Sequence, residues 1–174
     1  MVCAAGHLHP AKTTVPTGCT AVGILGKVTG TGHGLILALH KARNQSWNTI
    51  DGWASKEYAS TTLKALPDDE LGRFLTNNYT RLGSTTVSGW AVAQKDDYVA
   101  IFKNLGSTKN GYSNGEVFDA NVNAYITGAG GDAITEAGWS ASEDYGSYAW
   151  YFASEYWISN GKGISNSIWP VLGF

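Results

Sequence analysis

The C-terminal segment of the chain, residues 137–174, combines many aromatic residues with serine, glycine and asparagine. Nine aromatic residues lie between Trp139 and Trp169, whereas leucine, valine and isoleucine are sparse there. A segment that builds a core would use those aliphatic residues instead. Tyrosine gives a large contact area at small entropic cost, and serine, glycine and asparagine adapt their hydrogen bonds to a partner. The segment therefore predicts a recognition surface rather than a catalytic centre.

The composition of the whole chain excludes several classes of protein. Its 174 residues suit one domain that buries roughly 70% of its unfolded surface. The net charge is −2 and no basic stripe is present, so we expect no nucleic-acid partner. No apolar run approaches the length of a membrane span, and residues 1–3 do not resemble a signal peptide. We also expect no cofactor and no catalysis, because no nucleophile, zinc-protease or phosphate-binding motif is present.

Periodicity predicts three clear structural elements. Two short apolar runs within 21–39 flank the glycine-rich stretch 29–33, which predicts a β-hairpin. Tyr98, Ile101, Phe102 and Leu105 recur at helical spacing, which predicts an amphipathic helix over 94–105. Strands are expected again from Trp139 onward, with the last one interrupted by Pro170. Weaker signals predict helices at 56–66 and 68–75, and 107–138 shows little periodicity. Residues 1–20 are expected to be a tether or the remnant of a longer chain.

Cys3 and Cys19 are the only cysteines, and His7 and His9 lie between them. A disulfide would close a loop of about 17 residues and contribute on the order of 3 kcal/mol. Cysteine and histidine are also zinc ligands, although the C-x3-H-x-H-x9-C spacing matches no standard zinc pattern. A disulfide, two unpaired thiols and a metal site all stay open at this point. A disulfide would favour an exported protein.

Five segments, in order, resemble bacterial C-type-lectin-like domains. The segments are residues 21–39, GWAVAQKDDY at 89–98, WSASE at 139–143, AW at 149–150 and IWPV at 168–171. The resemblance covers about residues 21–174 and implies an α+β fold of C-type lectin type, with two helices and a twisted, mostly antiparallel sheet. Gln94 stands where the family has threonine or serine, so the resemblance leaves the cap of the predicted helix open.

The subgroup that the chain resembles most is the variable proteins of diversity-generating retroelements. In that subgroup a reverse transcriptase rewrites adenines in the C-terminal coding segment, here about 137–174, and the lectin fold displays the altered side chains. Trp169 replaces the family arginine, a change that one adenine substitution can produce. The resemblance implies a display protein on a cell surface, outside the cell or on a phage particle, which binds a protein or glycan on another cell.

The expected binding face contains residues of the strand at 149–153 and of a loop rich in serine, glycine and asparagine that carries Ile158 and Ile164. Trp150 and Phe152 are expected to fill the inward face of a strand, so Tyr151 should point outward. Exposed apolar residues gathered in one place mark interaction sites. The full set is Asp144, Gly146, Tyr148, Tyr151, Ala153, Ser154, Tyr156, Ile158, Ser159, Gly161, Gly163, Ile164, Asn166 and Trp169. The expected scaffold is Trp139, Ser140, Glu143, Trp150, Phe152, Trp157, Ile168 and Pro170.

Three alternatives to a diversified display protein stay open. A structural or adhesive subunit of a pilus or surface layer would use the same face for assembly. A calcium-dependent lectin would need six to eight oxygen ligands. The family's EPN and QPD motifs are absent, and Asp119, Asn121, Asn123 and Asp132 offer the best oxygen donors, although such alternation is also turn chemistry. An enzyme of the formylglycine-generating type shares the broad fold but needs cysteines near the C-terminus.

Overall fold

A computed structural model describes residues 1–10, 14–31, 33–47, 90–112 and 114–173, with only the backbone given for 42–45. It also describes the backbone of three short strands within 64–86. The expected helix at 68–75 lies outside these residues. Of the expected helix at 56–66, only Lys64–Ala65 is described, and it forms strand β5 instead of a helix.

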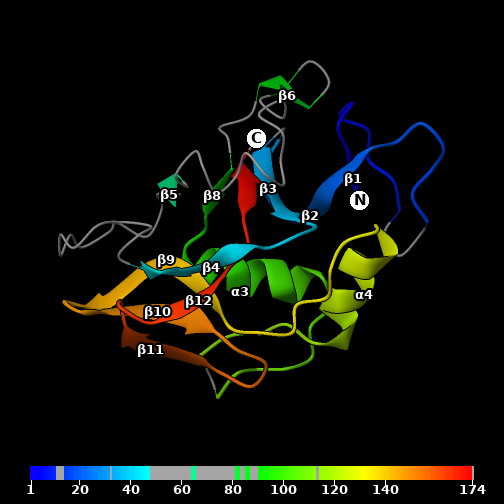
Figure 1. The fold of residues 1–174 in the computed structure, drawn as a ribbon. Coiled ribbons are helices and arrows are strands. Elements are labelled where there is room, and N and C mark those ends of the chain that lie inside the picture. Colours follow the sequence, from blue (N-terminus) through cyan, green and yellow to red (C-terminus); the bar gives the residue numbers. More distant parts are fainter. Residues whose placement is uncertain are drawn as a thin grey trace.

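The described strands form two main sheets (Figure 1). The six-stranded sheet has the order β1 (Val2–Cys3), β2 (Ala21–Gly30), β3 (His33–Ala38), β13 (Val171–Gly173), β8 (Trp90–Val92) and β5 (Lys64–Ala65). The five-stranded sheet has the order β11 (Trp157–Gly161), β10 (Tyr148–Phe152), β9 (Gly138–Tyr145), β12 (Ser165–Ile168) and β4 (Ala42–Ser46). A small ladder joins β6 (Arg81–Leu82) to β7 (Thr85–Thr86). The expected α+β class is confirmed, but the strands are divided between sheets instead of forming a single one.

The pairing of the described strands is mostly antiparallel, as expected. The predicted hairpin is confirmed, because β2 pairs with β3 antiparallel and Ile24 lies opposite Leu37. Among the described strands, only β12 and β9 run parallel. Pro170 separates β12 from β13 as predicted, and its carbonyl accepts a hydrogen bond from the Ala38 amide at 2.9 Å. The chain therefore passes from the five-stranded sheet to the six-stranded sheet at this proline.

Helix α3 (Lys95–Asn104) lies between the two sheets and carries the centre of the core (Figure 1). Tyr98, Ile101 and Phe102 are fully buried, as the helical spacing predicts. The Phe152 ring of β10 lies 5.2 Å from the rings of both Tyr98 and Phe102. Aromatic packing therefore anchors strand β10 to helix α3.

Gln94 is the N-cap residue of α3, but its side chain makes no cap hydrogen bond. The Ser142 hydroxyl of β9 takes that role, because it accepts a hydrogen bond from the Lys95 amide at 2.9 Å. The same hydroxyl donates to Gln94 Oε1 at 2.7 Å. The start of α3 is therefore satisfied by a neighbouring strand instead of its own cap.

Helix α4 (Ala120–Gly128) was not expected, since 107–138 shows little periodicity. Only Val122 and Ile126 are buried along it. Its N-cap is Asp119, whose carboxylate accepts hydrogen bonds from the amides of Asn121 and Val122. The N-cap and the two buried side chains therefore stabilise α4 within the folded chain, although its apolar pattern is weak.

Part of the N-terminal segment, expected to be a tether or the remnant of a longer chain, packs against the six-stranded sheet. Met1, Val2 and Cys3 are buried, and Val2–Cys3 pairs with β2 as an edge strand. Cys3 and Cys19 form a disulfide with their Cα atoms 5.5 Å apart. Apolar burial at the sheet edge and the covalent link attach this segment to the six-stranded sheet.

Candidate ligand-binding site

Strands β9, β10 and β11 form the framework of the candidate site. In the β10–β11 ladder, Tyr151 lies opposite Ile158 and Phe152 lies opposite Trp157. Residues opposite each other in a ladder share a face, so the two pairs point to opposite sides of the sheet. Phe152 and Trp157 are buried, whereas Ile158 is 45% exposed and Tyr151 is half-buried.

Most of the predicted scaffold residues are buried. Trp139, Ser140, Phe152, Trp157, Ile168 and Pro170 all lie inside. Trp150 is only half-buried. Its ring packs against the core, and the Lys95 ammonium group lies 3.7 Å from the ring centroid. Burial lowers the pKa of Lys95, although Asp96 and Asp144 partly oppose this effect.

Glu143 belongs to a buried ion pair. Its Oε1 atom lies 2.6 Å from Nζ of Lys162, and the two side chains are only 8% and 6% exposed. The Lys162 ammonium group also lies 4.4 Å from the centroid of the Trp47 ring. Glu143 was predicted to be a scaffold residue, and its ion pair joins β9 to the turn that follows β11.

The predicted binding residues divide into three groups by exposure. The exposed ones are Asp144, Gly146, Tyr148, Ser154, Ile158, Gly163 and Ile164. The half-buried ones are Tyr151, Ala153, Tyr156, Ser159, Gly161 and Asn166. Only Trp169 is buried, with 1% of its surface exposed.

The prediction that Trp169 lies on the exposed face is wrong. Its side chain belongs to the main core, and its carbonyl oxygen accepts a 2.5 Å hydrogen bond from the Tyr98 hydroxyl. Burial raises the pKa of that hydroxyl, so it stays protonated and can donate. Among the described residues, Nε1 of Trp169 has no hydrogen-bond partner. Trp169 lies in the short connection between β12 and β13, which belong to different sheets, so it is packed from both sides. The amino-acid composition of the segment does not predict this burial.

Three tyrosines meet at one end of the β10–β11 ladder, and we call them the tyrosine cluster: Tyr112, Tyr151 and Tyr156. The rings of Tyr112 and Tyr156 stack with centroids 6.4 Å apart. The Tyr151 ring meets Tyr156 edge-on at 6.3 Å and packs against the buried Trp139 at 5.5 Å. Burial, and then a hydrogen bond with Tyr156, raise the pKa of Tyr151, while Asn160 partly offsets this by its own hydrogen bond. The cluster is therefore ordered by its own contacts and supported from below by Trp139.

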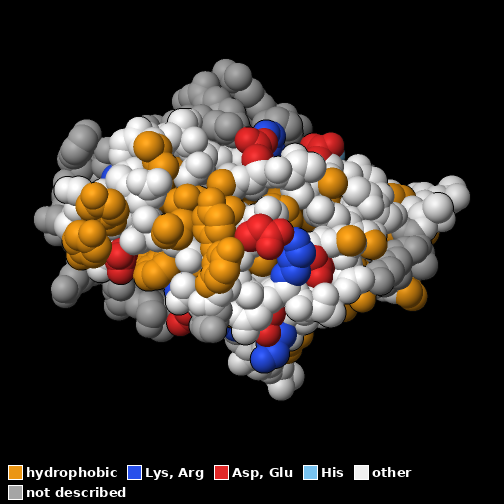
Figure 2. Space-filling model, turned by 90° about the horizontal axis from the view of Figure 1, so that it is seen from below, with side chains coloured by type: hydrophobic (Ala, Val, Ile, Leu, Met, Phe, Trp, Pro, Cys, Tyr) orange, Lys and Arg blue, Asp and Glu red, His pale blue; other side chains and the backbone are white. Residues whose placement is uncertain are grey.

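A second aromatic pair lies where β9 turns into β10. Tyr145 and Tyr148 stack with ring centroids 4.8 Å apart and are 62% and 38% exposed. Asp144, next to this pair, accepts a 2.6 Å hydrogen bond from the Ser159 hydroxyl. Figure 2 shows apolar side chains gathered on this face of the molecule, with acidic and basic groups among them.

Tyr112 lies outside the C-terminal segment, and sequence reasoning missed it. It is 76% exposed, the largest exposed fraction among the exposed large apolar side chains that the structure describes. Its φ of 47° lies in the left-handed region, which is unusual for a bulky residue and often marks a functional site. Flanking Gly111 and Asn114 predict a turn, but nothing in the local pattern indicates that the turn meets Tyr156.

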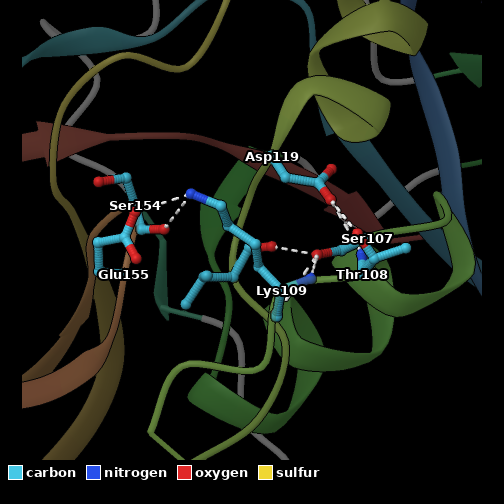
Figure 3. A network of polar contacts seen from close by, with 7 residues as sticks. Ser107, Thr108, Lys109, Asp119, Ser154 and Glu155 are labelled. Atoms are coloured by element: carbon cyan, nitrogen blue, oxygen red, sulfur yellow. Dashed lines mark hydrogen bonds and ion pairs between the residues drawn. The ribbon is translucent and has the colours of Figure 1, made fainter.

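The loop that carries Tyr112 is attached to the turn after β10. Lys109 Nζ contacts Glu155 Oε1 at 2.8 Å and the Ser154 carbonyl at 3.4 Å, while Thr108 donates to Asp119 (Figure 3). A Cβ atom on Gly111 would come within 2.9 Å of the Tyr156 Cα, so the two backbones lie in close contact. Trp157 Nε1 also donates to the Glu116 carbonyl at 2.9 Å. These contacts hold the ring of Tyr112 in place beside the predicted face.

Most of the candidate calcium ligands use their oxygen atoms in structural hydrogen bonds. Asp119 caps α4 through its carboxylate, and Asn123 Oδ1 accepts a hydrogen bond from the Ile134 amide, while Asn121 donates its Nδ2 to the Gly106 carbonyl. Asp132 Oδ2 lies 2.9 Å from Nδ1 of His40. Within the described residues, the one group with the composition and spacing of a metal site is Cys3, His9 and Cys19. No helix in the described part of the chain is both long and apolar enough to cross a membrane.

No model of a protein family matches this chain, and no curated protein matches it.

Proposed function

We propose that the chain is a ligand-binding display protein whose C-terminal region is diversified by retroelement mutagenesis. Its ligand is an external protein or glycan on another cell, and the chain acts at a cell surface, outside the cell or on a phage particle. The binding surface consists of the tyrosine cluster, Ile158, and the Tyr145–Tyr148 pair at the β9–β10 turn. No chemistry is performed at this surface.

The observation that carries this proposal is the difference in exposure between neighbouring residues of β10 and β11. The side chains predicted for the binding face are all exposed or half-buried except Trp169, whereas Phe152 and Trp157 beside them are buried. A surface of this kind can change its side chains without disturbing the packing beneath them. Tyrosine on a rigid support also limits the entropic cost of binding.

The diversification can be tested at the gene. We expect a near-identical template copy of codons 137–174 beside a reverse transcriptase gene, with differences at template adenines. Sequences of this gene from many cells of one lineage should then vary at the exposed and half-buried positions and stay constant at Phe152 and Trp157. Variation spread evenly over both classes, or the absence of a template copy, would contradict the proposal.

The binding role can be tested with point variants of the intact chain. Tyr151→Ala and Tyr156→Ala should keep the thermal melt close to that of the parent and reduce binding to a glycan array or to intact bacterial cells. Phe152→Ala is the matched control for folding, because it removes a buried ring from the same strand. If all three variants lower the melting temperature equally, the tyrosines are part of the core and the proposal fails.

A further inference from the structure

The N-terminal segment contains a second group of residues with chemistry of its own, apart from the aromatic face. Cys3 is buried, and Cys19 and His9 are half-buried. The two sulfur atoms and a ring nitrogen of His9 lie within 4.8 Å of one another. They line an open pocket of about 270 Å³ that is also lined by His7.

Backbone contacts bring these residues together independently of the disulfide. The His9 amide donates to the Met1 carbonyl and the Cys3 amide donates to the His7 carbonyl, both at 3.0 Å. Cys3 also pairs with Ala21 in the β1–β2 ladder, and Ala21 is two residues after Cys19 in the chain. The three ligand residues should therefore stay close together when the disulfide is reduced.

The spacing of these residues suits a zinc ion as well as a disulfide. Tetrahedral zinc with bonds of about 2.3 Å to sulfur and about 2.0 Å to nitrogen places its ligand atoms roughly 3.5–3.8 Å apart. To reach these separations, the sulfur atoms must move apart and the His9 nitrogen must move towards them, each by about one or two ångströms. Rotation of side chains in the open pocket can supply such movements.

We propose that the reduced chain binds one zinc ion through the thiolates of Cys3 and Cys19 and the imidazole of His9. An external dithiol reduces the disulfide to two thiols and is itself oxidised to a disulfide. The zinc ion then binds both sulfur atoms as thiolates and two protons are released, while a water molecule or His7 completes the tetrahedron. An external disulfide that accepts two electrons from the thiolates, and is itself reduced to a dithiol, re-forms the Cys3–Cys19 disulfide and releases the ion. The expectation of no bound metal then applies to the oxidised chain alone.

Metal titration of the intact chain tests this site. The chain, reduced and freed of metal without oxygen, should bind one Co²⁺ per molecule with a thiolate-to-cobalt charge-transfer band, and Zn²⁺ should displace the Co²⁺. Cys3→Ser should abolish that band. His9→Ala should weaken zinc binding at least about tenfold, because even outer partners of metal ligands control affinity by that factor. His33→Ala, at an exposed histidine of β3, is the matched control and should bind as the parent does.

Folding and the fourth ligand need separate controls. His9→Ala retains both cysteines, so a thermal melt of its oxidised form shows whether the segment still folds. His7→Ala measures how much the second histidine contributes to zinc affinity. An unchanged affinity would assign the fourth ligand position to water. The proposal is overturned if folded His9→Ala binds zinc as tightly as the parent, or if the reduced parent binds no more zinc than Cys3→Ser.

Discussion

The buried pair of Glu143 and Lys162 shows how one charged contact differs from another in the same molecule. Both of its side chains are nearly inaccessible to water, and Trp47 covers the ammonium group. Lys109 and Glu155 form a second ion pair of similar length, 2.8 Å, but these side chains are 45% and 62% exposed. Water screens the exposed pair, whereas loss of one partner in the buried pair leaves a charge without hydration.

Glu143→Ala is therefore expected to destabilise the chain by about 3–5 kcal/mol, because it leaves the Lys162 charge buried and unpaired. The double variant Glu143→Met with Lys162→Met should recover most of that loss, since it removes both charges. Glu155→Ala is the control for an exposed pair and should cost at most about 1 kcal/mol. Urea unfolding measures all three, and equal losses for Glu143→Ala and Glu155→Ala would show that burial of the first pair is not what matters.

Sequence reasoning at the residue scale succeeded where alternation along a strand determined exposure. It separated Phe152 from Tyr151 correctly, whereas Ile158 was expected in a loop and lies on strand β11. It failed for Trp169, whose burial depends on packing between two sheets, and for Tyr112, whose contact with Tyr156 joins segments far apart in the chain. Both misses concern long-range contacts, which leave no local pattern.

The elements of the fold differ in how strongly the sequence specifies them. The β2–β3 hairpin and α3 have clear apolar periods and were predicted. Helix α4 has few buried side chains, and its position depends on tertiary hydrogen bonds: Asn123 accepts from the Ile134 amide and donates to the Ile134 carbonyl. An element held by such contacts cannot be recognised from apolar spacing alone.

Asp119 fastens α4 at its N-terminus and gives that helix a pH dependence. Burial alone would raise the pKa of Asp119, but hydrogen bonds from Thr108, Val122 and Asn121 outweigh it and hold the pKa below its ordinary value of 3.8. A carboxyl group with a lowered pKa adds stability above its unfolded-state pKa, and this stability is lost as the pH falls through the folded-state pKa. The contribution of the cap should therefore be complete near neutral pH and disappear in strong acid.

Asp119→Ala should cost about 1 kcal/mol at neutral pH, the usual value of an N-cap. The free energy of unfolding, measured by urea from pH 7 down to pH 2, should show the difference between the variant and the parent shrinking below about pH 4. Asp96→Ala is the matched control, because Asp96 is an exposed carboxylate in the first turn of α3. A difference for Asp119→Ala that stays constant down to pH 2 would show that its carboxylate does not stabilise α4.

At the scale of the whole molecule, the disulfide and the candidate binding face belong to different sheets. Cys3 lies on the edge strand β1 of the six-stranded sheet, and Tyr151 and Ile158 lie on β10 and β11 of the five-stranded sheet. Helix α3 contacts both sheets and fills the space between them with buried aromatic rings. A covalent link at one sheet can therefore stabilise the chain without shaping the face on the other.

Removal of the disulfide should lower the overall stability and leave the tyrosine cluster unchanged. The closed loop has a sequence separation of 16, for which the chain-entropy model gives about 3 kcal/mol. For a domain of this size that loss lowers the melting temperature by roughly 6–12 °C. The variant Cys3→Ala with Cys19→Ala, melted in the presence of a chelator, should show this decrease, while the alkaline absorbance titration of its tyrosines should match that of the parent. A changed tyrosine titration with an unchanged melting temperature would contradict this prediction. It would show that the disulfide stabilises the binding face and not the overall fold.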